Sequence, residues 1–307
     1  MTDAFILHHY DRSPYAEKVR LMFGVTNSEW QSLLSPPWPP RPNVDPLAGG
    51  YRRIPVAQCG ADIFCDSAVI AEEVAQRTAC QALSPYGLND ADQSLVSLAE
   101  GEAFFSAIVA VPKLRALTTM LMAFGPFGVS RFMKDRASLL KGGKVSRVTP
   151  ERAKEVLSEL FLAMASRLQH QDWLSGDAPS IVDLSVYHPL WLHANVSRRA
   201  LVAPSVVTAW FARVAEIGQG HRREISQGEA FAAARDAEPV VVPTSIDEVP
   251  VALGTTVNVA PEDYGLVPVS GELAAVTDTR IIVARDTPQF GRLHVHFPRK
   301  NYSITPR

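Results

Sequence analysis

The stretch Ser13-Pro14-Tyr15-Ala16-Glu17-Lys18-Val19-Arg20-Leu21 decides the fold of the first part of this chain. It follows a short apolar run at residues 5–8 that predicts a strand, and it predicts a helix over residues 14–24. Proline is favoured at the first helical position because the N–H that it lacks would be unpaired there, and serine is favoured just before it. The stretch therefore predicts a strand-to-helix junction, with Ser13 at the positive end of the helix dipole.

The position of Ser13 suits a thiolate. Its hydroxyl would lie beside N–H groups that the first helical turn leaves unpaired. A sulfur held there would be favoured in its ionised form, and each unit by which its pKa falls corresponds to roughly 1.4 kcal/mol. Taken alone, the residues leave a simpler interpretation open, in which Ser13 only caps the helix.

The rest of the first segment continues the alternation of strands and helices. A second strand is predicted at residues 29–33, and an irregular arm with six prolines at residues 35–50. Residues 54–59 and 63–65 predict a hairpin, and residues 67–77 predict a helix. The predicted order is strand, helix, strand, irregular arm, hairpin and helix.

Three further motifs follow in order along the chain. Arg53-Ile54-Pro55-Val56 places a proline at the start of a β-like run, and Asp66-Ser67-Ala68-Val69-Ile70 places short polar residues before an apolar helical pattern. Ser180-Ile181-Val182-Asp183 fits a capping box, in which the serine accepts from the helix and the aspartate reaches back. The last motif predicts the start of a helix in a region that is helical throughout.

With these motifs in this order, residues 4–235 resemble the cytosolic glutathione transferases. The stretch at residues 13–21 is similar to the opening helix of the omega, tau and lambda types, and to the active site of glutaredoxins with both cysteines replaced. The resemblance implies a thioredoxin-like α/β domain followed by an all-helical domain. It also implies that Ser13 contacts the sulfur of glutathione, and that a serine there favours activating the thiol for conjugation. Tyr10 is the second choice for this role.

The resemblance also assigns the residues that hold the rest of the tripeptide. Pro55 is expected to follow a cis peptide bond that turns the backbone of Ile54 toward the cysteinyl part of glutathione. Arg53 is expected to bind the glycine carboxylate, with Arg52 as an alternative. Asp66 and Ser67 are expected to hold the γ-glutamyl end at a helix N-terminus. The predicted glutathione-binding residues are Arg53, Ile54, Pro55, Asp66 and Ser67.

Aromatic residues suggest where a second substrate would bind. A small apolar electrophile needs an apolar pocket near the thiol, although core packing of a helix is the commoner role for such side chains. The predicted pocket residues are Tyr15, Phe104, Phe105 and Phe124.

Three domains are predicted. Residues 1–80 form the thioredoxin-like glutathione-binding domain, and residues 90–237 the all-helical domain. Residues 238–307 contain short β-like runs at 239–243, 257–259, 273–276, 281–284 and 293–297, which predict a small all-β module of unknown role.

Composition excludes several classes of partner. The chain has 30 Lys+Arg against 32 Asp+Glu and a formal net charge of -2, which provides no field to gather nucleic acid or an anionic membrane. Three cysteines without a CxxC pattern indicate reduced thiols in a cytoplasm, and His294 and His296 are too few to predict a metal site. No signal peptide or membrane span is predicted.

The sequence therefore predicts a glutathione transferase with glutathione as co-substrate, a small apolar electrophile as second substrate, and no metal. A homodimer is implied by the resemblance alone. Two alternatives remain: a non-catalytic binding or interaction protein that keeps the glutathione site, and a glutathione-dependent thiol transferase or lyase. The second is disfavoured because Ser13 and Ala16 stand where redox cysteines would be.

Overall fold

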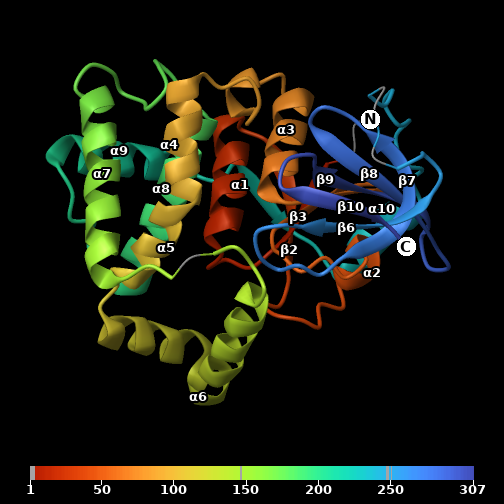
Figure 1. Cartoon of the computed structure of the whole chain (residues 1–307), viewed down its shortest axis with the longest axis horizontal. Coiled ribbons are helices and arrows are strands. Elements are labelled where there is room, and N and C mark those ends of the chain that lie inside the picture. Colours follow the sequence, from red (N-terminus) through yellow and green to blue (C-terminus); the bar gives the residue numbers. More distant parts are fainter. Residues whose placement is uncertain (1–3, 146, 247–248, 250) are drawn as a thin grey trace.

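The computed structural model describes residues 4–145, 147–246, 249 and 251–307. Over these residues one twisted sheet of ten strands runs through the molecule, in the order β10-β6-β7-β8-β9-β4-β3-β1-β2-β5. Helices gather at one end of this sheet, and the late strands form the other end (Figure 1). The strands are β1 (Phe5–His9), β2 (Glu29–Leu34), β3 (Val56–Cys59), β4 (Asp62–Cys65), β5 (His221–Glu224), β6 (Thr256–Pro261), β7 (Val269–Val276), β8 (Arg280–Thr287), β9 (Gly291–Pro298) and β10 (Tyr302–Pro306).

The first domain has the predicted order of elements. Strands β1 and β2 are parallel, and β3 and β4 continue the sheet in antiparallel fashion. Alternate side chains of β1 enter different cores: Phe5 and Leu7 pack with α1 and α3, whereas Ile6 packs with α10 on the opposite face. Both faces are therefore covered, which explains why every residue of β1 is buried.

The helical part is also confirmed. The capping box at Ser180 and Asp183 is formed, and it begins α8 as predicted. Asp183 also accepts a hydrogen bond from the indole of Trp210 (2.8 Å), so the cap ties α8 to α9. The helices are α1 (Pro14–Val25), α2 (Asp45–Ala48), α3 (Ser67–Arg77), the short 3-10 helix η1 (Gln81–Leu83), α4 (Asp90–Glu100), α5 (Glu102–Val109), α6 (Lys113–Leu140), α7 (Pro150–Leu168), α8 (Ile181–Ser197), α9 (Ser205–Glu216) and α10 (Gln227–Arg235).

The C-terminal strands are joined to the first domain. Strand β9 pairs in parallel with β4, with Ile63 opposite Val295. The two regions also share one apolar core, in which Leu47, Val56 and Ile63 of the first domain pack with Val295 and Phe297. The β module predicted from residue 238 onward is therefore present as strands β6–β10, and it extends the thioredoxin-like sheet.

Four local expectations differ from the structure. Residues 239–243 form no strand, because Pro239 and Pro243 lack the N–H that a ladder needs. The expected helical region contains a strand, β5, which pairs with β2; its sequence, His-Arg-Arg-Glu, has no apolar alternation to predict it. Strand β10 was not predicted, and the irregular arm contains the short helix α2.

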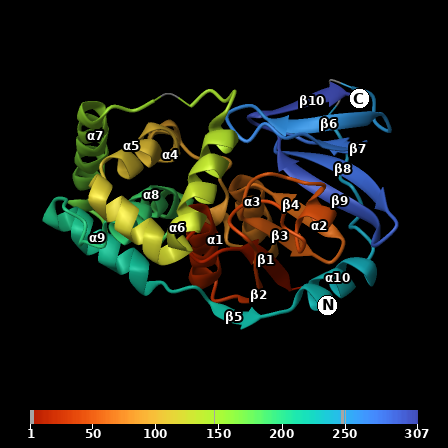
Figure 2. The ribbon, with the colours of Figure 1, turned by 90° about the horizontal axis from the view of Figure 1, so that it is seen from below.

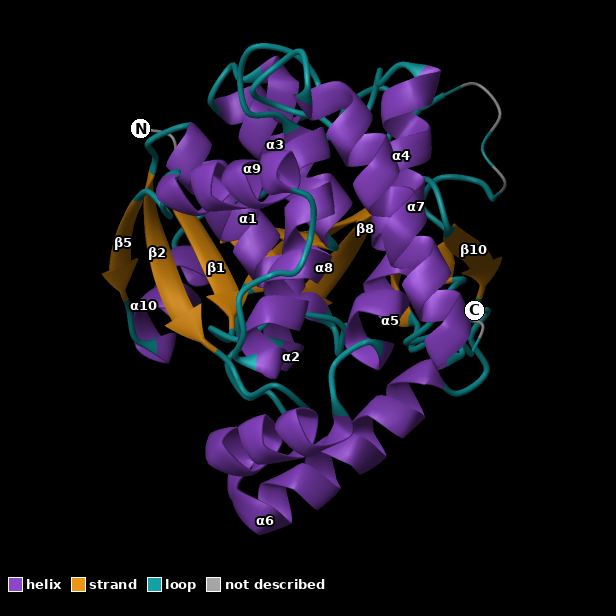
Figure 3. Cartoon of the chain, turned by 90° about the vertical axis from the view of Figure 1, so that its left-hand side faces the viewer, coloured by secondary structure: helices purple, strands orange, loops and turns teal. Residues whose placement is uncertain are grey.

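Helix α6 extends away from the rest of the molecule (Figure 3). It is broken at Gly125, whose φ of 66° is not helical, followed by Pro126. Its first half is attached to α8 through Thr119, and its second half to the proline-rich arm through Arg136. Among the described helices none is by itself long and apolar enough to cross a membrane; only α4–α5 and α6 taken together, bent by 95°, meet the length and composition criteria.

Candidate active site

The strand register brings the predicted glutathione-binding residues to one end of the sheet. His8 of β1 lies opposite Val56 of β3, and Val56 lies opposite Cys65 of β4. The residues that follow β1, precede β3 and follow β4 therefore meet at the same edge. These are the predicted residues Ser13, Arg53, Ile54, Pro55, Asp66 and Ser67.

Ser13 is the N-cap of α1, as predicted. Its Oγ accepts a hydrogen bond from the backbone N–H of Ala16 (3.2 Å), and Pro14 occupies the first turn. This bond uses an oxygen lone pair and does not consume the hydroxyl hydrogen, so the hydroxyl can still donate. The side chain is only 2% exposed, however, so a thiol reaches it only if the surrounding segments move.

Tyr10, the second choice for activating the thiol, meets Ser13 through its backbone. The Tyr10 carbonyl accepts a hydrogen bond from the Ser13 N–H (3.0 Å), which closes the turn between β1 and α1. This contact positions Ser13 and uses no part of the Tyr10 phenol.

The peptide bond between Ile54 and Pro55 is cis, as the resemblance implied. The two neighbouring arginines point to different partners. Arg52 forms an ion pair with Asp135 of α6, whereas Arg53 forms one with Asp66 (3.2 Å). The structure thus places Arg53, and not Arg52, beside the other predicted glutathione-binding residues.

Asp66 caps α3 in an unusual backbone conformation. Its φ is 97°, a region that non-glycine residues rarely adopt and that costs of order 1–3 kcal/mol. The carboxylate accepts hydrogen bonds from the Ala68 N–H (3.0 Å), from Arg53 and from the Tyr302 hydroxyl (3.0 Å). These bonds offset the strain and fix the carboxylate at the start of the helix. Ser67, next to it, is the first residue of α3 and is 7% exposed.

Two residues of the C-terminal module complete this polar cluster. Arg53 donates to the Asp263 carboxylate and to the Tyr264 carbonyl (2.5 Å), and the Tyr264 ring lies 4.0 Å from the guanidinium. Sequence reasoning missed Asp263 and Tyr264, and also the hydroxyl pair of Tyr51 and Tyr302 (2.7 Å). No local pattern could have identified them, because they lie about two hundred residues from their partners.

The predicted electrophile pocket is only partly assembled. The rings of Tyr15 and Phe104 are 5.0 Å apart, and Phe105 lies edge-on to Phe104. These three residues gather where α1 meets α5. Phe124 lies elsewhere: it stacks on Phe132 of α6 and packs against Trp38 of the proline-rich arm.

His188 completes the aromatic group between the two domains. Its ring lies 4.8 Å from that of Tyr15, and burial lowers the pKa of this histidine to about 4. Burial also raises the pKa of the Tyr15 phenol well above its ordinary value. Both side chains are therefore neutral at pH 7, and the contact between the two rings carries no charge.

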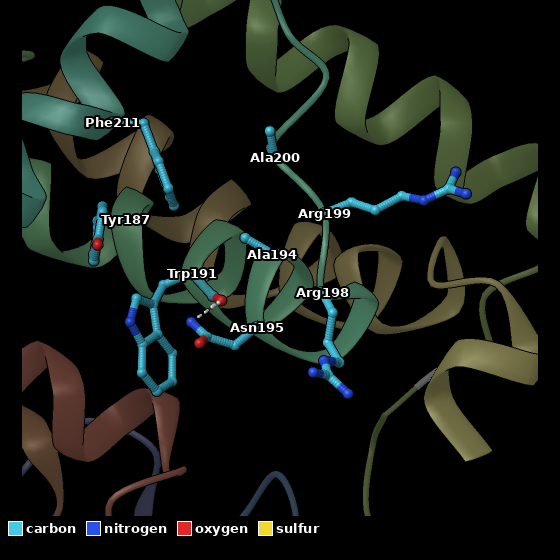
Figure 4. Close-up of a pocket in the computed structure, with 8 residues that line it drawn as sticks. All are labelled: Tyr187, Trp191, Ala194, Asn195, Arg198, Arg199, Ala200 and Phe211. Carbon is cyan, nitrogen blue, oxygen red and sulfur yellow. Dashed lines mark hydrogen bonds between the residues drawn. The ribbon is translucent and has the colours of Figure 1, made fainter. Parts of the chain in front are cut away.

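An open cavity lies away from these residues. It has a volume of about 450 Å³ and lies between the end of α8 and α9, where aromatic rings and two arginines line it (Figure 4). Its lining residues are Tyr187, Trp191, Ala194, Asn195, Arg198, Arg199, Ala200 and Phe211. The polar cluster at Arg53 has no part in this cavity.

The described residues contain no group of three or more metal-ligating side chains. His294 and His296 instead flank one carboxylate: Nε2 of His296 lies 2.8 Å from Oδ1 of Asp62, which is in the adjacent strand β4. The cysteines Cys59 and Cys65 are buried. The contact between His296 and Asp62 helps to join β9 to β4.

Comparison with known proteins identifies the domains. Residues 7–81 match the glutathione S-transferase N-terminal domain, and residues 110–217 match the glutathione S-transferase C-terminal domain. The chain is 31% identical to a GST-like protein from Pseudomonas syringae, over 100% of both chains, with a TM-score of 0.79. The chain belongs to the glutathione S-transferase family.

A more distant similarity covers part of the chain. A glutathione S-transferase from Methylobacillus flagellatus with glutathione bound is 19% identical over 70% of this chain and 99% of its own, with a TM-score of 0.48. The search of curated proteins found no match. The Pseudomonas syringae protein, in contrast, matches the whole chain, including the C-terminal strands.

Proposed function

We propose that the protein is a cytoplasmic, homodimeric glutathione transferase that joins glutathione to a small apolar electrophile. Glutathione lies across the ends of β1, β3 and β4, with its γ-glutamyl end at Asp66 and Ser67 and its glycine carboxylate at Arg53. The backbone at Ile54 and Pro55 pairs with its cysteinyl part.

In the proposed reaction the thiol first loses its proton to solvent. The Ser13 hydroxyl donates a hydrogen bond to the sulfur, and the N-terminus of α1 stabilises the negative charge. The sulfur then uses its electron pair to form a bond to an electrophilic carbon, and the leaving group departs with its own bonding pair. Tyr15, Phe104 and Phe105 provide the apolar surface for the electrophile, and Phe124 joins them only if α6 moves.

The observation that carries this proposal is the meeting of two capped helix N-termini at one edge of the sheet. Ser13 caps α1 and Asp66 caps α3, and in the strand register β1 and β4 end at the edge of the sheet where β3 begins. Each N-terminus presents unpaired N–H groups and a positive dipole end. Two such ends suit a molecule that carries a thiolate and carboxylates.

The experiment measures glutathione binding by calorimetry and conjugation with a panel of electrophiles, for the unmodified protein and Ser13→Ala. We expect Ser13→Ala to bind glutathione with similar affinity and to conjugate at least tenfold more slowly, with a raised pKa of the bound thiol. Ser226→Ala is the matched control, because Ser226 caps α10 at a distance from the site and its loss costs a similar amount of helix stability, about 1 kcal/mol. Equal activity of Ser13→Ala and Ser226→Ala would remove Ser13 from the mechanism.

Two observations favour a second candidate, a glutathione-fold protein that binds without turnover. Ser13 is nearly inaccessible and Arg53 is already paired, as expected if catalysis has been lost. Glutathione binding without conjugation of any electrophile would support this candidate. A thiol transferase is less well supported, because Cys65 is fully buried and burial raises the pKa of its thiol well above the ordinary value.

A further inference from the structure

The β6–β7 loop, residues 262–268, leaves the C-terminal module and reaches the predicted glutathione site. In Figure 2 it runs from the module toward the end of α6. Backbone hydrogen bonds hold it there: the Gly265 N–H donates to the Leu139 carbonyl (2.8 Å), and the Lys144 N–H donates to the Asp263 carbonyl (2.7 Å). The loop is thus anchored between the segment after α6 and the first domain.

The loop engages the arginine assigned to the glycine carboxylate of glutathione. One terminal nitrogen of Arg53 donates to Asp66, and the other donates to both the Asp263 carboxylate and the Tyr264 carbonyl. The Tyr264 ring covers the guanidinium, and its phenol also interacts with that of Tyr15 at the start of α1. Both terminal nitrogens of Arg53 therefore already have oxygen acceptors.

The chemistry of this contact matches that of the expected ligand. Asp263 presents a carboxylate to Arg53, and the glycine end of glutathione would present the same group. Two carboxylates, Asp66 and Asp263, already surround the guanidinium, so a third would bind against their combined negative charge. The glycine carboxylate and Asp263 cannot both use the same terminal nitrogen with full strength.

We propose that Asp263 and Tyr264 are specificity-determining residues of the glutathione site: Asp263 holds the guanidinium of Arg53 in the free protein, and a thiol ligand binds by displacing it with a carboxylate of its own. The inference rests on the proposed function. It assigns a role to the C-terminal module, which supplies an internal competitor for the glycine end of the ligand. Thiols without a carboxylate at that position have nothing with which to replace Asp263.

Solvent weakens part of the loop's attachment to the first domain. The Asp263 side chain is 41% exposed, so water screens its ion pair with Arg53 and weakens it. Leu266 and Val267 of the same loop are also exposed and contribute little burial. The fraction of molecules with the loop displaced sets the apparent affinity for glutathione, so variants that loosen the loop tighten binding.

Two variants loosen the loop by different means. Asp263→Asn keeps the size of the side chain and removes its charge. Gly143→Ala acts from outside the site, because a Cβ at residue 143 would lie 2.3 Å from the Asp263 carbonyl oxygen and would force the loop to shift. The matched controls are Asp286→Asn, an exposed ion-paired aspartate of the same module, and Gly228→Ala, where the nearest atom is 3.6 Å from the added Cβ.

The experiment measures calorimetric dissociation constants for reduced glutathione and for its glycine monoethyl ester, which lacks the carboxylate charge. We expect both loosened variants to bind glutathione at least fivefold more tightly than the unmodified protein and both controls. We also expect the preference for glutathione over the ester to increase in Asp263→Asn, because Arg53 is then free to bind the carboxylate. Hydrogen exchange should be faster at residues 262–268 in both loosened variants.

The outcomes separate the two proposals. If the unmodified protein binds glutathione and the loosened variants bind it equally or more weakly, the loop is no competitor and this inference fails while the proposed function stands. If the loosened variants exchange faster in the loop but neither they nor the unmodified protein bind glutathione, the proposed function fails and the role of Asp263 fails with it. Equal gains for glutathione and the ester would also overturn the inference, because the competition would not involve the carboxylate.

Discussion

The hydroxyl of Tyr302, in the last strand of the sheet, lies 3.0 Å from the carboxylate of Asp66, which caps the third helix. The same hydroxyl lies 2.7 Å from that of Tyr51, so one buried oxygen joins the C-terminal module to the predicted γ-glutamyl site. The C-terminal module, to which the sequence assigned no role, is therefore hydrogen-bonded directly to the predicted glutathione site.

Tyr302→Phe is expected to lower the free energy of unfolding by about 1–3 kcal/mol, because Asp66 and Tyr51 each lose a buried hydrogen-bond partner. Denaturant-induced unfolding of the variant and of the unmodified protein measures this change in the free energy of unfolding. Asp66→Asn keeps a good N-cap and changes the same bond, so the two substitutions together should cost clearly less than the sum of their separate costs. Strict additivity would show that the bond contributes nothing.

Asp183→Ala is expected to destabilise the helical domain by at least about 3 kcal/mol. Its carboxylate is fully buried and accepts from the Ser180 N–H (3.0 Å), the Leu174 N–H (2.8 Å) and the Trp210 indole. Removing the carboxylate leaves these buried donors without an acceptor. The melting temperature and the tryptophan fluorescence of the protein should both change, because the Trp210 indole loses its acceptor. Glu229→Ala, which removes the corresponding residue of the exposed capping box of α10, should cost much less.

Acid should destabilise the protein between about pH 6.5 and pH 4, in part through His188. Burial lowers the pKa of this histidine to about 4, although the nearby Glu100 favours its charged form and Lys18 opposes it. Below pH 6.5 the unfolded chain binds a proton that the folded protein does not, so the stability present above pH 6.5 is lost as the pH falls.

His188→Phe tests this contribution. A phenylalanine keeps an aromatic ring beside Tyr15 and Phe104 and cannot take up a proton. The dependence of unfolding free energy on pH should become shallower by up to about 1.4 kcal/mol per pH unit within that window. His170→Phe, at an exposed position, is the control. An unchanged slope in His188→Phe would mean that another group causes the acid sensitivity.

Removing residues 238–307 should prevent the first domain from folding normally. The truncated chain would expose the backbone of β4 and the apolar side chains that pack against Val295 and Phe297. We expect an aggregating protein that binds a hydrophobic dye, measured against the full chain by light scattering and dye fluorescence. The expectation would be contradicted by a truncated protein that is monomeric and that keeps the melting temperature of the full chain and the helix content of its first two domains.

Much of the fold was predictable because local signals determine it. The helix at residues 67–77 was predicted with its observed bounds, and the caps at Ser13 and Ser180 were predicted from residue types next to each other in sequence. Strand β5 gave no such signal: it is exposed, carries four polar residues and forms only because β2 lies beside it. Long-range pairing of this kind overrides local propensity.

The candidate site divides in the same way. The sequence identified the residues that carry their own helix or strand motif, and the strand register places them together. It could not identify Asp263, Tyr264 or Tyr302, because their contacts depend on how a loop and a strand from the far end of the chain meet Arg53 and Asp66. The same limit explains Phe124, whose aromatic character was evident but whose direction depends on the break at Gly125.

The parallel pairing of β4 with β9 also has a consequence for biosynthesis. More than two hundred residues separate the two strands, so the ribosome makes β4 long before its neighbour exists. During that interval the nascent first domain presents an open strand and the apolar side chains of Ile63 and Val56 to the cell. A chaperone that shields this edge until β9 emerges would improve the yield of native protein.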